Sequence, residues 1–135
     1  MNWKLILQLS LFGLAMGIAT VFLIPSNIEP AFWLAIFLVC AYFISQRTGR
    51  PFFHGLLLGL ANSVWITASH ILFFDQYIAH HPREAAMMSS MPLPDSPRLM
   101  MALTGPVVGL VSGGIIGLIA IAARKLLKRP SRNTA

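Results

Sequence analysis

The residues that could do chemistry gather in and beside one polar stretch, "FFDQYIAHHPREAAMMSSMPLPDSPR", from Phe73 to Arg98. Imidazole and carboxylate groups there could bind Zn(II), and thioethers, including those of Met100 and Met101, could bind Cu(I). The candidate metal ligands are His70, Asp75, His80, His81, Glu84, Met87, Met88 and Met91. Their spacing forms no HExxH, CxxC or regular Met-x-x-Met motif, and the adjacent side chains of His80 and His81 point apart in most backbone conformations. The simpler interpretation is a connector that caps the protein, with both histidines solvated; a metal site is the alternative.

A second group of polar residues lies on the apolar segment before this stretch. At 100° per residue, Asn62, Ser63, Thr67 and His70 share one broad side of a helix with Gly55 and Gly59. Such a face must point into a helix bundle, where each hydrogen bond contributes about 0.6 kcal/mol. The alternative is a small polar cavity that opens outward, with His70 near its mouth.

Catalysis and ion-coupled transport are not favoured by these residues. Ser69 and His70 are adjacent and cannot face each other across a site, and an Asp75–His80 pair has no nucleophile or oxyanion hole beside it. Asp, Glu, Lys and Arg are absent from the four apolar segments defined below, whereas coupled carriers place an ionisable group at mid-depth. The single cysteine, Cys40, is interpreted as a packing residue. We therefore expect no enzyme activity and no cofactor.

The elements that must position these residues are four apolar segments. Hydrophobic residues make up 56% of the 135-residue chain and charged residues only 10%, well below the roughly 25% of a soluble domain. Because unpaired backbone groups are too costly in lipid, we expect an all-α fold of four transmembrane helices. The predicted spans are residues 5–24, 31–46, 52–74 and 99–123. Residues 1–129 form a single membrane domain, and residues 130–135 a disordered cytoplasmic tail.

The distribution of Lys and Arg predicts the orientation of these spans. Eight of the ten basic residues precede the first span, join the second to the third, or follow the fourth. Only Arg83 and Arg98 lie in the remaining connections. By the positive-inside rule both termini are cytoplasmic, and the outer segment, residues 75–98, faces outward. The net charge of +6 then meets anionic headgroups, and nucleic acid is not expected as a partner.

The outer segment is predicted to contain a short amphipathic helix. Pro82 suits the first turn of a helix, and Glu84 follows early, where the helix dipole favours an acid. Glu84, Met87, Met88 and Met91 then share one face, and Arg83, Ser89 and Ser90 the other. Such a helix would rest on the membrane and cover the bundle.

Small residues at four-residue spacing predict close helix packing in three of the four spans. The pattern resembles a glycine zipper, and its members are Gly13, Gly17, Gly55, Gly59, Gly105, Gly109, Gly113 and Gly117. Such faces let helix backbones approach closely in lipid. They could pack within one chain or against a second copy, and both alternatives stay open. Pro106 lies past the first turn of the fourth span, where it removes a backbone hydrogen bond.

The second half of the chain resembles a known kind of protein. "FFHGLLLGLANSVWITASHILFFDQYIAHHPREAAMM" followed by "PVVGLVSGGIIGLIAIAARKLLKR" is similar to a group of small four-helix bacterial membrane proteins of unknown function. In that group an aromatic-rich third helix runs into a Tyr-x-x-x-x-Pro segment, here Tyr77 to Pro82. The resemblance implies a four-helix fold in the bacterial inner membrane and brings no activity.

Together these patterns predict a non-enzymatic, oligomerising or accessory membrane component. Its partners would be membrane lipid, a second copy or another membrane protein, to which the outer segment is presented. The alternative is an outward-facing Cu or Zn binder or a passive small-solute pore.

Overall fold

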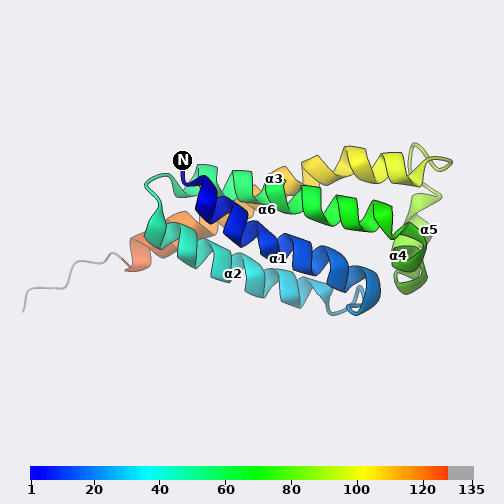
Figure 1. The fold of residues 1–135 in the computed structure, drawn as a ribbon, viewed down its shortest axis with the longest axis horizontal. Helices are drawn as coiled ribbons and strands as arrows, with labels where there is room; N and C mark the ends of the chain where they lie inside the picture. Colours follow the sequence, from blue (N-terminus) through cyan, green and yellow to red (C-terminus); the bar gives the residue numbers. More distant parts are fainter. Residues whose placement is uncertain (128–135) are drawn as a thin grey trace, which may run out of the picture.

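The protein is a bundle of six helices in the computed structural model, which describes residues 1–127 (Figure 1). Four helices are long and apolar enough to cross a membrane: α1 (Trp3–Phe22), α2 (Glu29–Arg47), α3 (Pro51–Leu72) and α6 (Pro97–Leu127). Their bounds lie within a few residues of the four predicted apolar segments. The two short helices are α4 (Phe74–His80) and α5 (Pro82–Met88). The predicted disordered tail, residues 130–135, lies outside the described residues.

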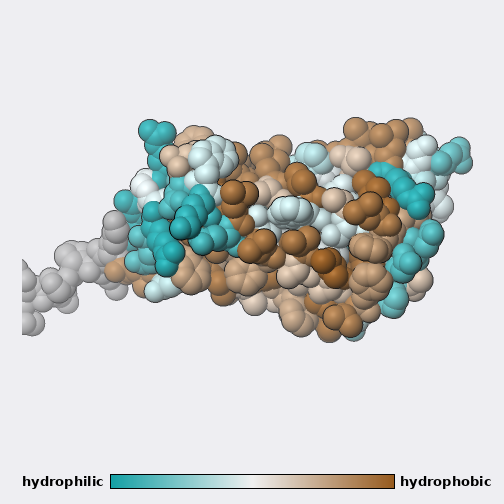
Figure 2. Space-filling view, in the orientation of Figure 1, coloured by the Kyte–Doolittle hydropathy of each residue, from teal (hydrophilic) through white to brown (hydrophobic). Residues whose placement is uncertain are grey.

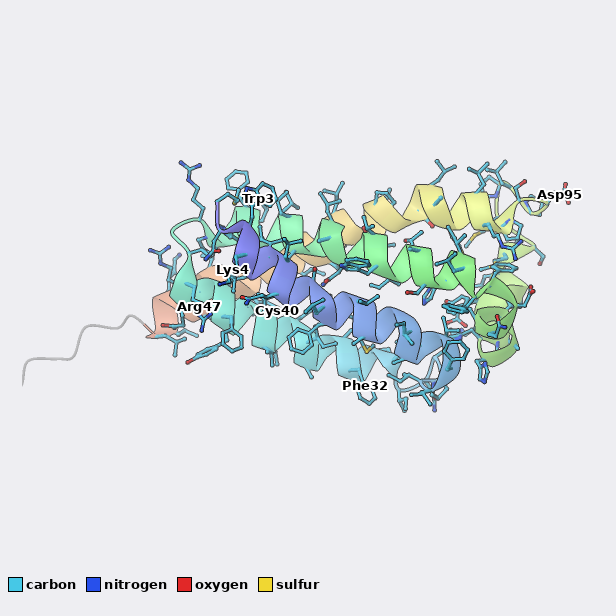
Figure 3. All side chains as sticks on the ribbon, viewed as in Figure 1. Trp3, Lys4, Phe32, Cys40, Arg47 and Asp95 are labelled. Carbon is cyan, nitrogen blue, oxygen red and sulfur yellow. The ribbon has the colours of Figure 1, made fainter. Side chains whose placement is uncertain are left out.

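The two ends of the bundle differ in composition. Lys4 and Arg47 lie at one end, here called the basic end, and Asp95 lies at the other, the loop end (Figure 3). Helices α4 and α5 lie at the loop end beside the connection between α1 and α2 (Figure 1). The visible face carries a hydrophobic band between two hydrophilic ends (Figure 2). Large apolar side chains are exposed on every long helix, for example Leu7, Leu34, Val64 and Val107, as a lipid surrounding requires.

Helix α3 is central because its small residues let two other helices approach it closely. On one side a Cβ added at Gly13 of α1 would lie 2.5 Å from Asn62 Oδ1, and one at Gly17 would lie 2.8 Å from Ser69 Oγ. On the other side Gly59 meets the backbone of Gly109 and Gly113 in α6. The predicted small-residue faces are thus occupied by contacts within one chain.

Helices α2 and α6 pack together in the half of the bundle nearer the basic end. Cys40, Ala41 and Ile44 of α2 share a buried cluster with Ile116 and Ala120 of α6. Leu5 and Leu9 of α1 and Leu58 of α3 complete this cluster. The main apolar core therefore lies toward the basic end.

Hydrogen bonds fix the chain connections at the basic end. The backbone N–H of Asn2 donates to His54 Nε2 at 3.0 Å, and His54 Nδ1 donates to the Arg50 carbonyl at 2.8 Å. The guanidinium of Arg124 donates to the carbonyl oxygens of Thr48 and Gly49. These bonds tie the start of α1 and the last turns of α6 to the turn between α2 and α3.

The loop end contains one helix that the sequence predicted and one that it did not. A helix does begin at Pro82, as expected, and it ends at Met88. The separate helix α4 was not predicted. It forms because α3 ends at Leu72 and the chain turns at Phe73, whose ring packs edge-on against Phe22 of α1 at a centroid distance of 5.3 Å.

Candidate binding cavity

A cavity of about 420 Å³ lies near the loop end, between α2, α3 and α6 and beneath the outer segment. The lining residues nearest the basic end are Phe37 on α2, Gly59 on α3 and Ser112 on α6. The α2–α6 packing at Cys40 and Ile116 begins just beyond them. The two helices therefore pack toward the basic end and border a partly enclosed cavity toward the loop end. Sites for small molecules commonly have volumes of about 300–1,000 Å³.

Most of the cavity wall is apolar and adaptable. Trp33 and Phe37 supply aromatic rings from α2. Five of the seven methionines line the cavity: Met87, Met88, Met91, Met100 and Met101. Methionine is flexible and polarizable, and methionine-rich surfaces accept ligands of varied shape.

The face of α3 that borders the cavity is polar. The four residues predicted to share one face, Asn62, Ser63, Thr67 and His70, all line the cavity. Asn62 is only 3% exposed, and its Oδ1 has no hydrogen-bond partner within residues 1–127. This oxygen packs against Gly13 of α1 and does not face the cavity.

His70 has a defined orientation at the outer part of this wall. Its Nε2 lies 2.8 Å from Thr20 Oγ1, and the Thr20 hydroxyl also lies 2.8 Å from the Met16 carbonyl. The contact joins α3 to α1 and fixes the orientation of the imidazole ring.

Three aromatic rings stack at the outer end of the cavity. The ring of Tyr77 lies 4.0 Å from that of His70 and 4.3 Å from that of His81, measured between centroids. His81 Nδ1 donates to the Tyr77 carbonyl at 3.0 Å. Burial raises the pKa of the Tyr77 phenol, and the negative charges of Glu29 and Glu84 raise it further. The phenol therefore stays protonated well above neutral pH.

The structure corrects the interpretation of one of the two adjacent histidines. His80 is exposed, as expected, but His81 is fully buried at 0% exposure. Its Nε2 has no hydrogen-bond partner within the described residues and lies 3.6 Å from Glu29 Oε2. His81 is buried because its ring stacks on that of Tyr77 and lies beside Glu29 at the start of α2.

Two carboxylates, those of Glu29 and Glu84, line the cavity. Glu29 Oε1 accepts a hydrogen bond from Trp33 Nε1 at 3.0 Å. Glu84 Oε2 accepts one from Ser26 Oγ at 2.9 Å. Among residues 1–127 no Lys or Arg nitrogen lies within 4.0 Å of either carboxylate. The sequence analysis identified Glu84 but missed Glu29; the four-residue spacing from Glu29 to Trp33 was the available signal.

The predicted metal ligands are not brought to one centre. Asp75 and His80 are exposed and do not line the cavity, whereas His70, Glu84, Met87, Met88 and Met91 do. In the part of the chain that the structure describes, no three His, Cys, Asp or Glu side chains are close enough to hold one ion. A thioether site remains a prediction.

The comparisons with known proteins add no identification. No family model matches the chain, and neither the search of curated proteins nor that of solved structures gives a match. The resemblance to small four-helix bacterial membrane proteins therefore stays a prediction.

Proposed function

We propose that this protein is a non-enzymatic accessory component of the bacterial inner membrane that binds a small amphiphilic molecule in its cavity. The observation that carries the proposal is the composition of one 420 Å³ cavity, which combines five methionines and the aromatic side chains of Trp33, Phe37 and Tyr77 with the polar face of α3. An apolar cavity with a few convergent polar groups is typical of a ligand site. The orientation proposed with it places both termini in the cytoplasm and the cavity mouth on the outer side.

The position of the cavity supports entry from the membrane. Helices α2 and α6 converge only toward the basic end, so the cavity lies between them at the depth of the outer half of the spans. A ligand dissolved in the bilayer would reach it between these helices. The outer segment, through Met87, Met88 and Met91, would then cover the ligand.

The glycine faces pack helices within one chain, which argues against a role for them in oligomerisation. Gly55 and Gly59 of α3 already meet Gly109, Gly113 and Gly117 of α6. Assembly with a second copy would have to use other surfaces. We therefore favour the accessory role over the oligomerising one.

A matched pair of variants on α6 tests the proposal. Ser112 lines the inner end of the cavity, and its neighbour Val111 is 60% exposed on the outer face. Ser112→Phe adds a ring to the cavity, whereas Val111→Phe adds one to the lipid-facing surface. We expect native mass spectrometry of wild type, extracted from cells in mild detergent, to show a small-molecule adduct that persists in Val111→Phe and is lost in Ser112→Phe.

Two results would overturn the proposal. One is an adduct that Ser112→Phe and Val111→Phe retain equally, because the molecule would then lie on the lipid-facing surface. The other is the absence of any adduct both after extraction and after incubation with added lipids and hydrophobic ions. The melting temperatures of both variants serve as the control for folding.

A further inference from the structure

The charges around the cavity indicate the class of ligand. Although the whole chain carries a formal charge of +6, the cavity is lined by two carboxylates, Glu29 and Glu84. Within the part of the chain that the structure describes, no Lys or Arg lines it. His81 Nε2 lies 3.6 Å from Glu29 Oε2, whereas in residues 1–127 no Lys, Arg or His nitrogen lies within 4.0 Å of the Glu84 carboxylate. We propose that the cavity binds a lipophilic cation, a molecule with a positively charged nitrogen or phosphorus centre on an apolar body; this inference rests on the proposed function.

Aromatic and sulfur groups beside the carboxylates suit such a ligand. Trp33 and Phe37 line the cavity, and the faces of aromatic rings attract cations that have been removed from water. Methionine side chains accommodate the apolar body. Glu29 is held by the indole N–H of Trp33, so its charge and the aromatic ring are fixed beside each other. A cation held there would contact both groups at once.

Polar side chains also lie deeper in the cavity. Asn62, Ser63, Thr67 and His70 line its α3 wall. The unpartnered oxygen of Asn62 packs against Gly13 of α1 and does not face the cavity. The charge preference therefore rests on the two carboxylates and on the aromatic ring held beside Glu29.

Two ions of matched size test the charge preference. Tetraphenylphosphonium and tetraphenylborate have nearly the same shape and opposite charge. Isothermal titration of the purified protein in an uncharged maltoside detergent, corrected with protein-free micelles, compares their affinities. Because a carboxylate favours one ion and repels the other, we expect tetraphenylphosphonium to bind at least about tenfold more tightly.

The four acids of the chain provide their own matched controls. Glu29→Gln and Glu84→Gln remove a charge from the cavity while keeping an oxygen for the hydrogen bonds from Trp33 and Ser26. Asp75→Asn removes an exposed charge that does not line the cavity. We expect each Glu variant to weaken tetraphenylphosphonium binding about tenfold and Asp75→Asn to leave it unchanged.

A second arm distinguishes a free cation from the ammonium group of a lipid. Native mass spectrometry with added phosphatidylethanolamine or phosphatidylglycerol reports which headgroup is retained. Phosphatidylethanolamine adducts that decrease in Glu29→Gln and Glu84→Gln identify a lipid headgroup as the source. Binding of tetraphenylphosphonium without such adducts identifies a free amphiphile.

The remaining outcomes separate the charge preference from the proposed function. Equal affinity for the two ions, or Glu variants that bind like wild type, overturns the cation preference. If Ser112→Phe still abolishes binding in that case, the cavity remains a ligand site. If neither ion binds and phosphatidylethanolamine forms no adduct, the cation inference is wrong.

Discussion

A single added methyl group at Gly59 should separate α3 from α6. A Cβ at this position would overlap the Gly109 carbonyl oxygen and the Cα and nitrogen atoms of Gly113. All three are backbone atoms, so none can rotate aside as the end of a side chain could. Carbon atoms in contact lie about 3.5–4.0 Å apart, and restoring that spacing requires the helices to move by on the order of 1 Å.

The cost of Gly59→Ala follows from this overlap. Overpacking typically costs about 1–3 kcal/mol, and we expect about 3 kcal/mol because the movement also loosens the contact between Gly55 and Gly117. Gly114→Ala is the matched control: a Cβ there meets nothing within 4 Å, and helix propensity favours alanine by about 1 kcal/mol.

Reversible unfolding by dodecyl sulfate from mild-detergent micelles, followed by far-ultraviolet circular dichroism, measures both changes. Equal stability of Gly59→Ala and Gly114→Ala, within about 0.5 kcal/mol, would refute the reasoning because the α3–α6 backbone contact would then not stabilise the fold.

Two further predictions concern the ends of the bundle. His54→Ala removes the acceptor for the Asn2 N–H and the bond to the Arg50 carbonyl, so it should lower the free energy of unfolding by about 1 kcal/mol in the same assay. His80 is exposed, and His80→Ala should leave the free energy of unfolding unchanged. Equal losses of stability in the two variants would contradict this prediction. In a Tyr42→Phe background, the phenolate absorbance of Tyr77 should rise only above the ordinary pKa of about 10. Because the unfolded chain releases this proton at a lower pH than the folded protein, the free energy of unfolding should fall as pH rises beyond about 10. Ionisation of Tyr77 in the folded protein at or below that pH would argue against its burial near Glu29 and Glu84.

The positions of the long helices could be predicted from the sequence because they depend on local quantities. A run of about 20 apolar residues crosses a bilayer whatever surrounds it, and Pro82 begins a helix through its own fixed dihedral angle. The polar face of α3 followed from the 100° turn per residue. The spacing of Gly109 and Gly113 likewise predicted a close helix contact, although it did not indicate that the partner was α3.

The cavity could not be predicted because it depends on how distant segments meet. Its volume arises where α2 and α6 stop packing beyond Cys40 and Ile116, which no periodicity encodes. The burial of His81 depends on α4 and on the stacking of Tyr77 against His70. In the sequence His81 is adjacent to His80, and nothing in the neighbouring residues indicates that one is buried and the other exposed. Tertiary packing alone distinguishes the two residues.

Cysteine labelling of Ser112 tests the central claim, a ligand cavity inside the bundle whose mouth opens on the outer side, most directly. Position 112 is the middle of the 31-residue helix α6, and thiols react with maleimide only where water allows the thiolate to form. Native Cys40 is fully buried and Val111→Cys would face lipid, so neither should react in intact membranes. The account predicts one label per chain in Ser112→Cys and slower labelling when tetraphenylphosphonium is present. Labelling of Ser112→Cys as slow as that of Val111→Cys would contradict it.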